Sequence, residues 1–430
     1  MAAERQVSPL RGWLALSPLP VFTALYVGVS LAAGDFYAMP VATAFLLASV
    51  YALAVTTAGP VRARLDLFSR GAANPDILLM IWIFILAGAF AASARSIGCI
   101  DATVGLVLQF LPGRLVPAGL FVGACLISLS IGTSVGTVVA LVPMAAGLAA
   151  TTGADPAMMV AIVVGGAFFG DNLSFISDTT IAATRTQGCG MADKFRANFR
   201  IVMPAALLVL IYYIWFGYSH EMPPLDAAAA GHAKVVPYLI VLIGALCGVN
   251  VAVALVLGII SVLIVGMAGG GPGLTGWFTA MGRGIASMGD LITVTLLAGG
   301  MLEVIRHGGG IDFLLRAMTR RVRRRRGAAL TIAALVSVAN ICTANNTIAI
   351  ITVGSLAAGI SRRFGLEPRR VASLLDTFSC VVQGILPYGA QLLMAGSLAM
   401  LSPLAIISRL YYPLALLACA LASIALMRDK

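Results

Sequence analysis

Long runs of apolar residues dominate this sequence, and they limit what kind of fold it can adopt. Of its 430 residues, 60% are hydrophobic and 10% are charged, whereas a soluble domain carries about 25% charged residues. This composition excludes one large soluble globule, and it excludes disorder, which requires low hydrophobicity and high charge. About 12 segments of membrane-spanning length fit into the chain. The sequence therefore predicts an all-α polytopic membrane protein.

Several functional classes are excluded by what the sequence lacks. The net charge is +11, but the basic residues do not gather on a polar domain, so nucleic acid is not an expected partner. No nucleotide-binding G-x-x-x-x-G-K-[ST] motif occurs. The seven cysteines are scattered through apolar segments, and no metal-ligand or nucleophile–base set appears. We therefore expect neither an enzyme nor a bound cofactor.

The sequence contains an internal repeat. The segment 87–101 resembles 298–312 at an offset of 211 residues. Two further pairs of motifs follow in the same order, at offsets of 210 and 212: Thr133/Thr137 with Thr343/Thr347, and Gly153-x-x-Pro156 with Gly365-x-x-Pro368. An ordered series of matches indicates a duplication. We predict four parts: an N-terminal membrane hairpin (1–59), a first copy (60–217), a connecting loop with linker helices (218–271) and a second copy (272–427).

The arginine and lysine residues predict that the two copies are inverted. In the first copy the loops 62–70 and 185–200 are basic, and in the second copy the opposite loops, 306–326 and 361–370, are basic. Basic loops face the cytoplasm. The two copies would therefore have opposite orientations in the membrane, and both termini would be cytoplasmic. We interpret the arginine run at 320–326 as a topology determinant, with anionic lipid head groups as an alternative partner. Inverted repeats are typical of secondary transporters.

Short apolar runs, interrupted by glycine, proline and polar residues, predict discontinuous helices and re-entrant hairpins. Two of these runs, 134–151 and 346–361, are too short for a simple span. Unpaired backbone is tolerated at membrane depth only where it lines a cavity. We therefore expect the breaks to surround a binding site between the two copies.

The first break contains a dense cluster of oxygen-bearing side chains. A charged side chain at the bilayer centre costs at least about 2.5–3.5 kcal/mol, so two acids there require a cation, a proton or water. Oxygen ligands suit a hard cation such as Na⁺, and competition between a cation and a proton for one carboxylate would give exchange. Helix capping is the structural alternative. The candidate ion-binding residues are Asp171, Asn172, Ser174, Ser177, Asp178, Thr179 and Thr180, with Asp171, Asp178, Ser174 and Thr179 as the Na⁺ ligands.

The second copy and two hairpin tips add neutral polar groups. Gln383 takes the position of Asp171 at an offset of 212. Asp376 lies in the apolar run before it, and this acid is either functional or a buried, hydrogen-bonded structural residue. The glycines of G166-x-x-x-G170 are interpreted as close helix packing. The tips contribute Thr133, Ser134 and Thr137 in the first copy and Thr343, Asn345, Asn346 and Thr347 in the second.

The stretch GDNLSFISDTT, followed by TANNT, LLDTFSCVVQG and PYGAQ, resembles the NhaC-type sodium/proton antiporters. The family pattern reads roughly GDxxSPxSDTT, and Phe175 stands where the family usually has proline. The residues that match it are Asp171, Ser174, Ser177, Asp178, Thr179 and Thr180. The resemblance implies a carrier in the bacterial inner membrane that expels Na⁺ in exchange for protons.

Two functions follow as hypotheses. The first is Na⁺/H⁺ antiport by alternating access, with sodium ions, protons and the lipid bilayer as partners and a second copy of the chain as a candidate partner. The second keeps the fold but changes the cargo to an organic or amino acid carried with Na⁺ or H⁺. Arg185 and the N-termini of half-helices would then bind its carboxylate.

Overall fold

The computed structural model describes residues 9–33, 39–174, 177–219, 232–247, 249–269, 271–311, 313 and 324–427. Within these residues every regular element is a helix. Eight helices are long and apolar enough to cross a membrane, which confirms the all-α polytopic membrane protein. Phe175, most of the arginine run at 320–326 and much of the connecting loop lie outside the described residues.

The N-terminal region and the first copy contribute helices α1 to α11. Their bounds are α1 (Pro9–Leu16), α2 (Pro18–Ala33), α3 (Val41–Val55), α4 (Val61–Ala72), α5 (Pro75–Ser96), α6 (Cys99–Phe110), η1 (Gly113–Leu115), α7 (Val116–Ile131), α8 (Ser134–Thr152), α9 (Pro156–Leu173), α10 (Asp178–Gln187) and α11 (Met191–Ser219).

The connecting region and the second copy contribute the remaining helices. Their bounds are η2 (His232–Val235), α12 (Val236–Leu246), α13 (Val251–Ala268), α14 (Gly273–Ser287), α15 (Gly289–His307), α17 (Arg325–Thr343), α18 (Asn346–Phe364), α19 (Pro368–Ile385), α20 (Ala390–Ala399), α21 (Pro403–Ile407) and α22 (Tyr411–Ala425).

Corresponding helices in the two copies end at equivalent sequence positions. Each of three helix ends has a residue in the left-handed conformation, and its counterpart 212 residues later adopts the same conformation. This conformation favours glycine, because other residues bring Cβ close to the backbone. The repeat of these helix ends supports the duplication. The three pairs are Gly132 (φ 72) and Ala344 (φ 50), Gly153 (φ 70) and Gly365 (φ 63), and Gly188 (φ 65) and Met400 (φ 57).

The predicted breaks interrupt one long helix in each copy. α9 and α19 each have 18 residues and begin with a proline, Pro156 or Pro368, which suits the first helical position because its missing N–H needs no partner there. Each ends in extended backbone and is followed by a helix of 10 residues, α10 or α20. The described residues thus contain two discontinuous helices, α9/α10 and α19/α20.

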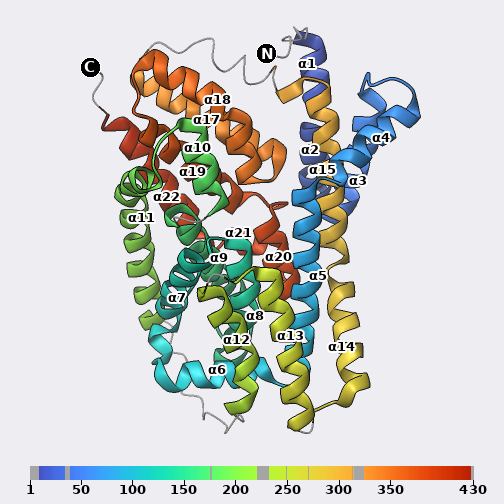
Figure 1. The fold of residues 1–430 in the computed structure, drawn as a ribbon, viewed down its shortest axis with the longest axis vertical. Helices are drawn as coiled ribbons and strands as arrows, with labels where there is room; N and C mark the ends of the chain where they lie inside the picture. Colours follow the sequence, from blue (N-terminus) through green and yellow to red (C-terminus); the bar gives the residue numbers. More distant parts are fainter. Residues whose placement is uncertain are drawn as a thin grey trace.

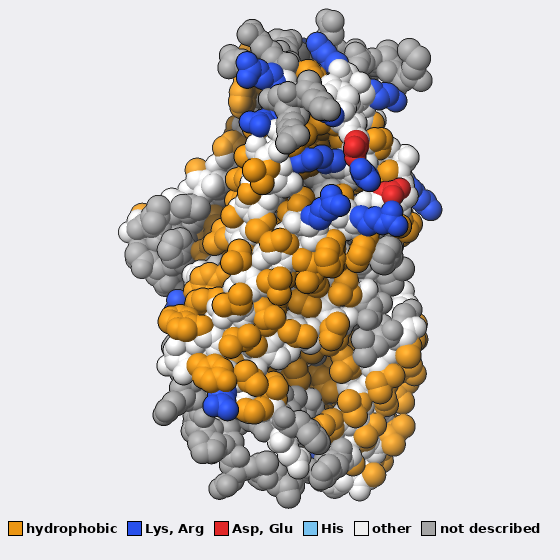
Figure 2. Space-filling view, turned by 90° about the vertical axis from the view of Figure 1, so that its left-hand side faces the viewer, with side chains coloured by type: hydrophobic (Ala, Val, Ile, Leu, Met, Phe, Trp, Pro, Cys, Tyr) orange, Lys and Arg blue, Asp and Glu red, His pale blue; other side chains and the backbone are white. Residues whose placement is uncertain are grey.

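These discontinuous helices lie inside the molecule, with apolar helices around them. Every residue of α9 after Pro156 is buried. Figure 1 shows α9, α19 and α20 in the middle, with α17 and α18 towards one end and α6 and α7 towards the other. This placement is the one expected of inverted copies, and their inversion stays a prediction. The outer surface exposes large apolar side chains such as Leu208 and Ile264, and Figure 2 shows a broad hydrophobic face, as lipid contact requires.

Small residues bring α9 and α7 into close contact. A Cβ atom built on Gly166 would lie 2.6 Å from Cβ of Ala124, and one on Gly170 would lie 2.2 Å from Cβ of Ser128. Ser128 Oγ donates a hydrogen bond to the Ala167 carbonyl oxygen at 2.6 Å. The interpretation of G166-x-x-x-G170 as a close packing surface is therefore confirmed.

Candidate functional site

A cavity of about 590 Å³ lies where the two breaks and the two hairpin tips meet. Polar residues from both copies line it, so segments more than 150 residues apart in the chain contribute to one site. The polar lining comprises Thr133, Ser134, Asp171, Asp178, Thr179, Arg185, Thr186, Asn345, Asn346, Thr347, Gln383 and Gln391.

Asp171 is the buried acid of this cavity. Its side chain is 5% exposed and lies in the last turn of α9. Its Oδ2 accepts hydrogen bonds from Ser134 Oγ at 2.9 Å and from Asn346 Nδ2 at 3.4 Å. Ser134 and Asn346 are the first residues of α8 and α18. One carboxylate therefore contacts both hairpin tips.

A chain of side-chain hydrogen bonds extends from Asp171 into the second copy. Gln391 Nε2 donates to Ser134 Oγ at 2.9 Å, and Gln383 Nε2 donates to Gln391 Oε1 at 2.9 Å. Gln383 Nε2 also donates to the Ala344 carbonyl oxygen at 3.0 Å. Gln383 Oε1 is buried and has no hydrogen-bond partner among the described residues. An unpaired buried acceptor is costly, and a cation in the cavity would supply its partner.

Asp178 lies at the opening of the cavity and is exposed. The expectation that both carboxylates are buried therefore holds for Asp171 alone. The physical reason is that Asp178 is the first residue of α10, after the break. An acid there interacts with the positive end of the helix while it remains hydrated. The two acids thus have different surroundings.

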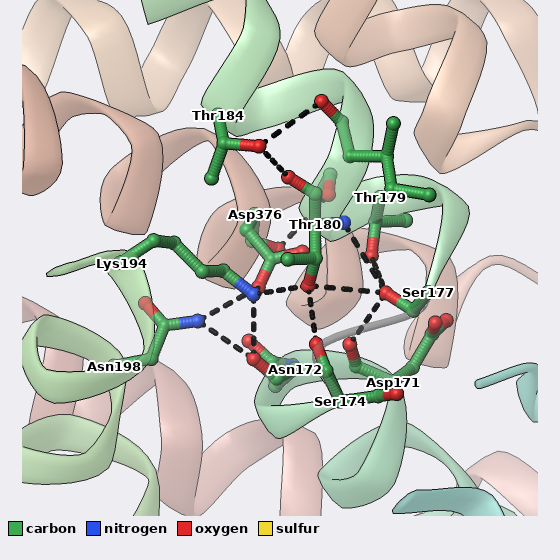
Figure 3. A network of polar contacts seen from close by, with 12 residues as sticks. Asp171, Asn172, Ser174, Ser177, Thr179, Thr180, Thr184, Lys194, Asn198 and Asp376 are labelled. Atoms are coloured by element: carbon green, nitrogen blue, oxygen red, sulfur yellow. Dashed lines mark hydrogen bonds and ion pairs between the residues drawn. The ribbon is translucent and has the colours of Figure 1, made fainter. Parts of the chain in front are cut away.

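A second polar network lies behind Asp171, around a lysine (Figure 3). Lys194 Nζ lies 2.7 Å from Asp376 Oδ2, and the two side chains are 1% and 0% exposed. Lys194 Nζ also donates to the Asn172 carbonyl oxygen at 2.7 Å and to Thr180 Oγ1 at 2.6 Å. Figure 3 shows the side chain of Asp171 pointing away from Lys194. The lysine therefore binds both sides of the break and the second copy.

Asn198 completes this network. Its Nδ2 donates to Asp376 Oδ2 at 2.7 Å and to the Asn172 carbonyl oxygen at 2.8 Å. Lys194 and Asn198 are one turn apart on α11, so they face the same way. The expectation that 185–200 is a basic loop is wrong for Lys194, because α11 begins at Met191 and the lysine side chain on it is buried. Asp376 is brought to the lysine and does not line the cavity.

The hydroxyl groups around the first break hold its backbone in place. Thr180 Oγ1 donates to the Ser174 carbonyl oxygen at 2.8 Å, and Ser177 Oγ donates to the Asp171 carbonyl oxygen at 3.0 Å. Ser174 Oγ donates to the Leu129 carbonyl oxygen at 3.1 Å. Of the predicted Na⁺ ligands, Asp171, Asp178 and Thr179 line the cavity, and Ser174 does not.

A smaller cavity, of about 70 Å³, lies on the other side of the second hairpin tip. Thr343 and Glu303 line it, whereas Thr137 lines neither cavity and donates to the Thr133 carbonyl oxygen. Met80, Ala344, Asn345 and Ala390 border both cavities. These four residues therefore form a thin layer between two spaces.

Four helices begin at the large cavity. The first residues of α8, α10, α18 and α20 line it, and each helix N-terminus carries a partial positive charge. Arg185, on α10, also lines the cavity. The cavity thus combines one buried carboxylate and neutral oxygens, which suit a cation, with helix ends that suit an anion.

Comparison with known proteins decides the family. The model of the Na⁺/H⁺ antiporter family matches residues 8–218 and 227–428, which is nearly the whole chain. The chain belongs to the Na⁺/H⁺ antiporter family. The resemblance of GDNLSFISDTT and the motifs that follow it to sodium/proton antiporters is thereby confirmed, and the family is one of transporters, not of enzymes.

Two relatives in the antiporter family are named Na⁺/H⁺ antiporter NhaC. The one from Alkalihalophilus pseudofirmus is 25% identical over 289 residues, which are 60% of this chain and 62% of the relative, so the match spans less than two thirds of its length. The one from Bacillus subtilis is 24% identical over 353 residues, 73% of this chain and 75% of the relative. The solved YdaH transporter of Alcanivorax borkumensis aligns with a TM-score of 0.42 and 15% identity, over 96% of each chain.

Proposed function

We propose that this protein exchanges Na⁺ for protons, and that the Asp171 carboxylate binds the two in turn. The observation that carries the proposal is that Asp171 is a buried acid at a cavity built from both copies. An ionised carboxylate in such a place is stable only with a positive partner. Na⁺ and H⁺ would each neutralise it, so the binding of one would release the other.

The surroundings of Asp171 support a Na⁺ ion as cargo. Ser134 Oγ lies 2.9 Å from the carboxylate, and the buried Gln383 Oε1 lacks a partner among the described residues. Carboxylate, hydroxyl and amide oxygens are the ligands of hard cations. Asp178, at the cavity opening, would attract cations from solution before they reach Asp171.

The thin layer of Met80, Ala344, Asn345 and Ala390 suggests how the site would open to either side. The large cavity lies on one side of this layer and the small cavity on the other. A shift of the second hairpin tip against α20 would close one cavity and widen the other. Alternating access by inverted copies (60–217 and 272–427) is the mechanism that we propose.

The distribution of arginine supports an orientation in the membrane. By the positive-inside rule, the basic segments 62–70, 185–200, 306–326 and 361–370 would face the cytoplasm, together with both termini. The proposed location is the bacterial inner membrane. A homodimer is proposed as an assembly to be tested by cross-linking in the membrane.

The test of the proposed exchange uses everted membrane vesicles with a fluorescent reporter of the pH gradient. Addition of NaCl should collapse the gradient in vesicles that hold the wild-type protein. Asp171→Asn should abolish the response, and the matched control Asp101→Asn, an exposed acid on α6, should keep it. A response of wild-type size from Asp171→Asn would contradict the proposal.

A second candidate function is the coupled transport of an organic or amino acid. It is favoured by one observation, the four helix N-termini and Arg185 around the cavity, because these groups bind carboxylates. Uptake of a panel of radiolabelled carboxylates by proteoliposomes separates the two functions. Uptake that requires Arg185 and a Na⁺ or H⁺ gradient would support this candidate, and the absence of uptake would exclude it for the panel.

A further inference from the structure

We propose that an arginine-lined pocket between α11, α17, α19 and the end of α22 binds a phosphate group. The pocket has a volume of about 470 Å³ and is separate from the cavity of Asp171. Its ligand would be either an anionic membrane phospholipid or a soluble phosphorylated compound. The arginines that line it are Arg196, Arg200, Arg325, Arg369 and Arg370.

The charges in this pocket are not balanced by its own acids. Arg369 Nε lies 2.6 Å from Glu367 Oε2, and Arg196 Nη1 lies 3.8 Å from Asp193 Oδ1. Within the described part of the chain, the other three arginines have no carboxylate partner. Three unpaired positive charges around one pocket repel each other, and an anion between them would remove that repulsion.

Two of these three arginines are already held in place by the protein. Arg370 Nη2 donates to the Ser423 carbonyl oxygen at 2.7 Å, and Arg325 Nη2 donates to the Gly365 carbonyl oxygen. Arg325 Nε is buried and has no acceptor among the described residues. Arginine binds phosphate oxygens through pairs of N–H groups. A phosphate oxygen that reaches Arg325 Nε after a shift of the arginine side chain would satisfy this donor.

The walls of the pocket suit a ligand that is apolar beyond its phosphate. Ile201, Leu366, Leu374 and Met427 line the pocket together with the arginines. α11 and α22 lie on the face drawn in Figure 2, where basic side chains gather at one end above a broad hydrophobic surface. A phospholipid would place its phosphate among the arginines and its acyl chains along that surface.

The pocket also lies next to the buried lysine network. Arg196 and Arg200 are on α11, as is Lys194, and Arg369 and Arg370 are on α19, as is Asp376. A phosphate bound to arginines of both helices would hold α11 against α19. We therefore expect occupancy of the pocket to stabilise the whole chain, because a ligand bound only to the folded state raises its stability.

The experiment measures the melting temperature of the delipidated, detergent-purified full chain. The added probes are phosphatidylglycerol, zwitterionic phosphatidylcholine and soluble pyrophosphate, and lipid that stays bound is quantified by mass spectrometry. The test variant carries Arg200→Gln, Arg325→Gln and Arg370→Gln. The matched control carries Arg62→Gln, Arg95→Gln and Arg283→Gln, which remove the same charge from exposed arginines outside the pocket.

We expect an anionic probe to raise the melting temperature of the wild type and the control variant, and to leave the test variant unchanged. Retention of the bound probe should fall by about tenfold or more in the test variant, because charge-assisted hydrogen bonds are lost. Stabilisation by phosphatidylglycerol alone identifies a lipid, and stabilisation by pyrophosphate alone identifies a soluble ligand. No stabilisation by either, or equal stabilisation of the test and control variants, overturns the proposal.

Discussion

Lys194 and Asp376 form an ion pair between α11 and α19, with 2.7 Å between Nζ and Oδ2 and with both side chains buried. The two charges cancel inside the protein. Among the described residues, Asp171, which lines the large cavity, is the buried acid that this pair does not neutralise, and we propose it as the site of the transported cation.

Removal of one partner of the ion pair should destabilise the protein strongly. Lys194→Met or Asp376→Leu would each leave an uncompensated buried charge, which costs about 3–5 kcal/mol. The double variant leaves no charge, so it should recover most of the loss. Melting temperatures in detergent check this prediction, and a double variant as unstable as the sum of the single variants would contradict it.

An exposed ion pair provides the matched comparison. Arg409 Nε lies 2.9 Å from Asp155 Oδ2, and both side chains are partly in solvent. Exposed pairs contribute little to stability. We expect Arg409→Gln and Asp155→Asn to leave the melting temperature close to that of the wild type. A drop as large as that of Lys194→Met would show that burial is not the decisive difference.

The two acids of the first break should differ in their effects on transport. Asp171→Asn removes the buried carboxylate and should abolish Na⁺-dependent proton movement. Asp178→Asn changes an exposed acid at the cavity opening, so exchange should persist with a higher half-saturating Na⁺ concentration. Titration with NaCl in vesicles measures both. Complete loss of exchange in Asp178→Asn, with activity retained in Asp171→Asn, would reverse the assignment.

The hydrogen-bond chain through Gln391 should set the affinity for Na⁺. Gln391→Leu removes the bonds from Gln391 to Ser134 and from Gln383 to Gln391. A lost hydrogen bond in a buried network costs about 1–2 kcal/mol, so we expect the half-saturating Na⁺ concentration to rise by about five- to thirtyfold. An unchanged concentration at a wild-type protein level would show that this chain does not hold the ligand oxygens in place.

Close packing of α7 and α9 should make Gly170 necessary for full stability of the protein. Gly170→Ala would place Cβ 2.2 Å from Cβ of Ser128, so the helices must separate, and overpacking typically costs about 1–3 kcal/mol. Gly123→Ala, on α7, is the control, since nothing lies within 4 Å of its added Cβ. Melting temperature and surface expression check the pair. Equal stability of the two variants would contradict the packing argument.

The breaks and the tips of the site could be predicted from sequence because they depend on local chemistry. Proline is favoured in the first turn of a helix, as at the start of α9 and α19, and clustered glycines and polar residues, as around 170–180 and 383–391, weaken a helix and favour its end. The internal repeat then placed Gln383 opposite Asp171. The cavity contains both residues, and this correspondence required no knowledge of tertiary structure.

The role of Lys194 could not be predicted, because tertiary contacts decide it. Lys194 is in the first turn of α11 beside Arg196, which is exposed, and local sequence does not indicate which of the two faces the interior. Its partner Asp376 lies 182 residues away in the chain. One signal was available: Lys194 is one of three lysines, and Asn198 follows it at helical spacing.

Uptake of radioactive sodium by proteoliposomes tests the central role of Asp171 most directly. Liposomes that contain only the purified protein and an acidic interior would be diluted into a neutral buffer with the labelled ion. We predict uptake by the wild type that requires the pH gradient and stops when a proton ionophore collapses it, and no uptake by Asp171→Asn. Uptake of equal size without a pH gradient, or by Asp171→Asn, would contradict the exchange at this carboxylate.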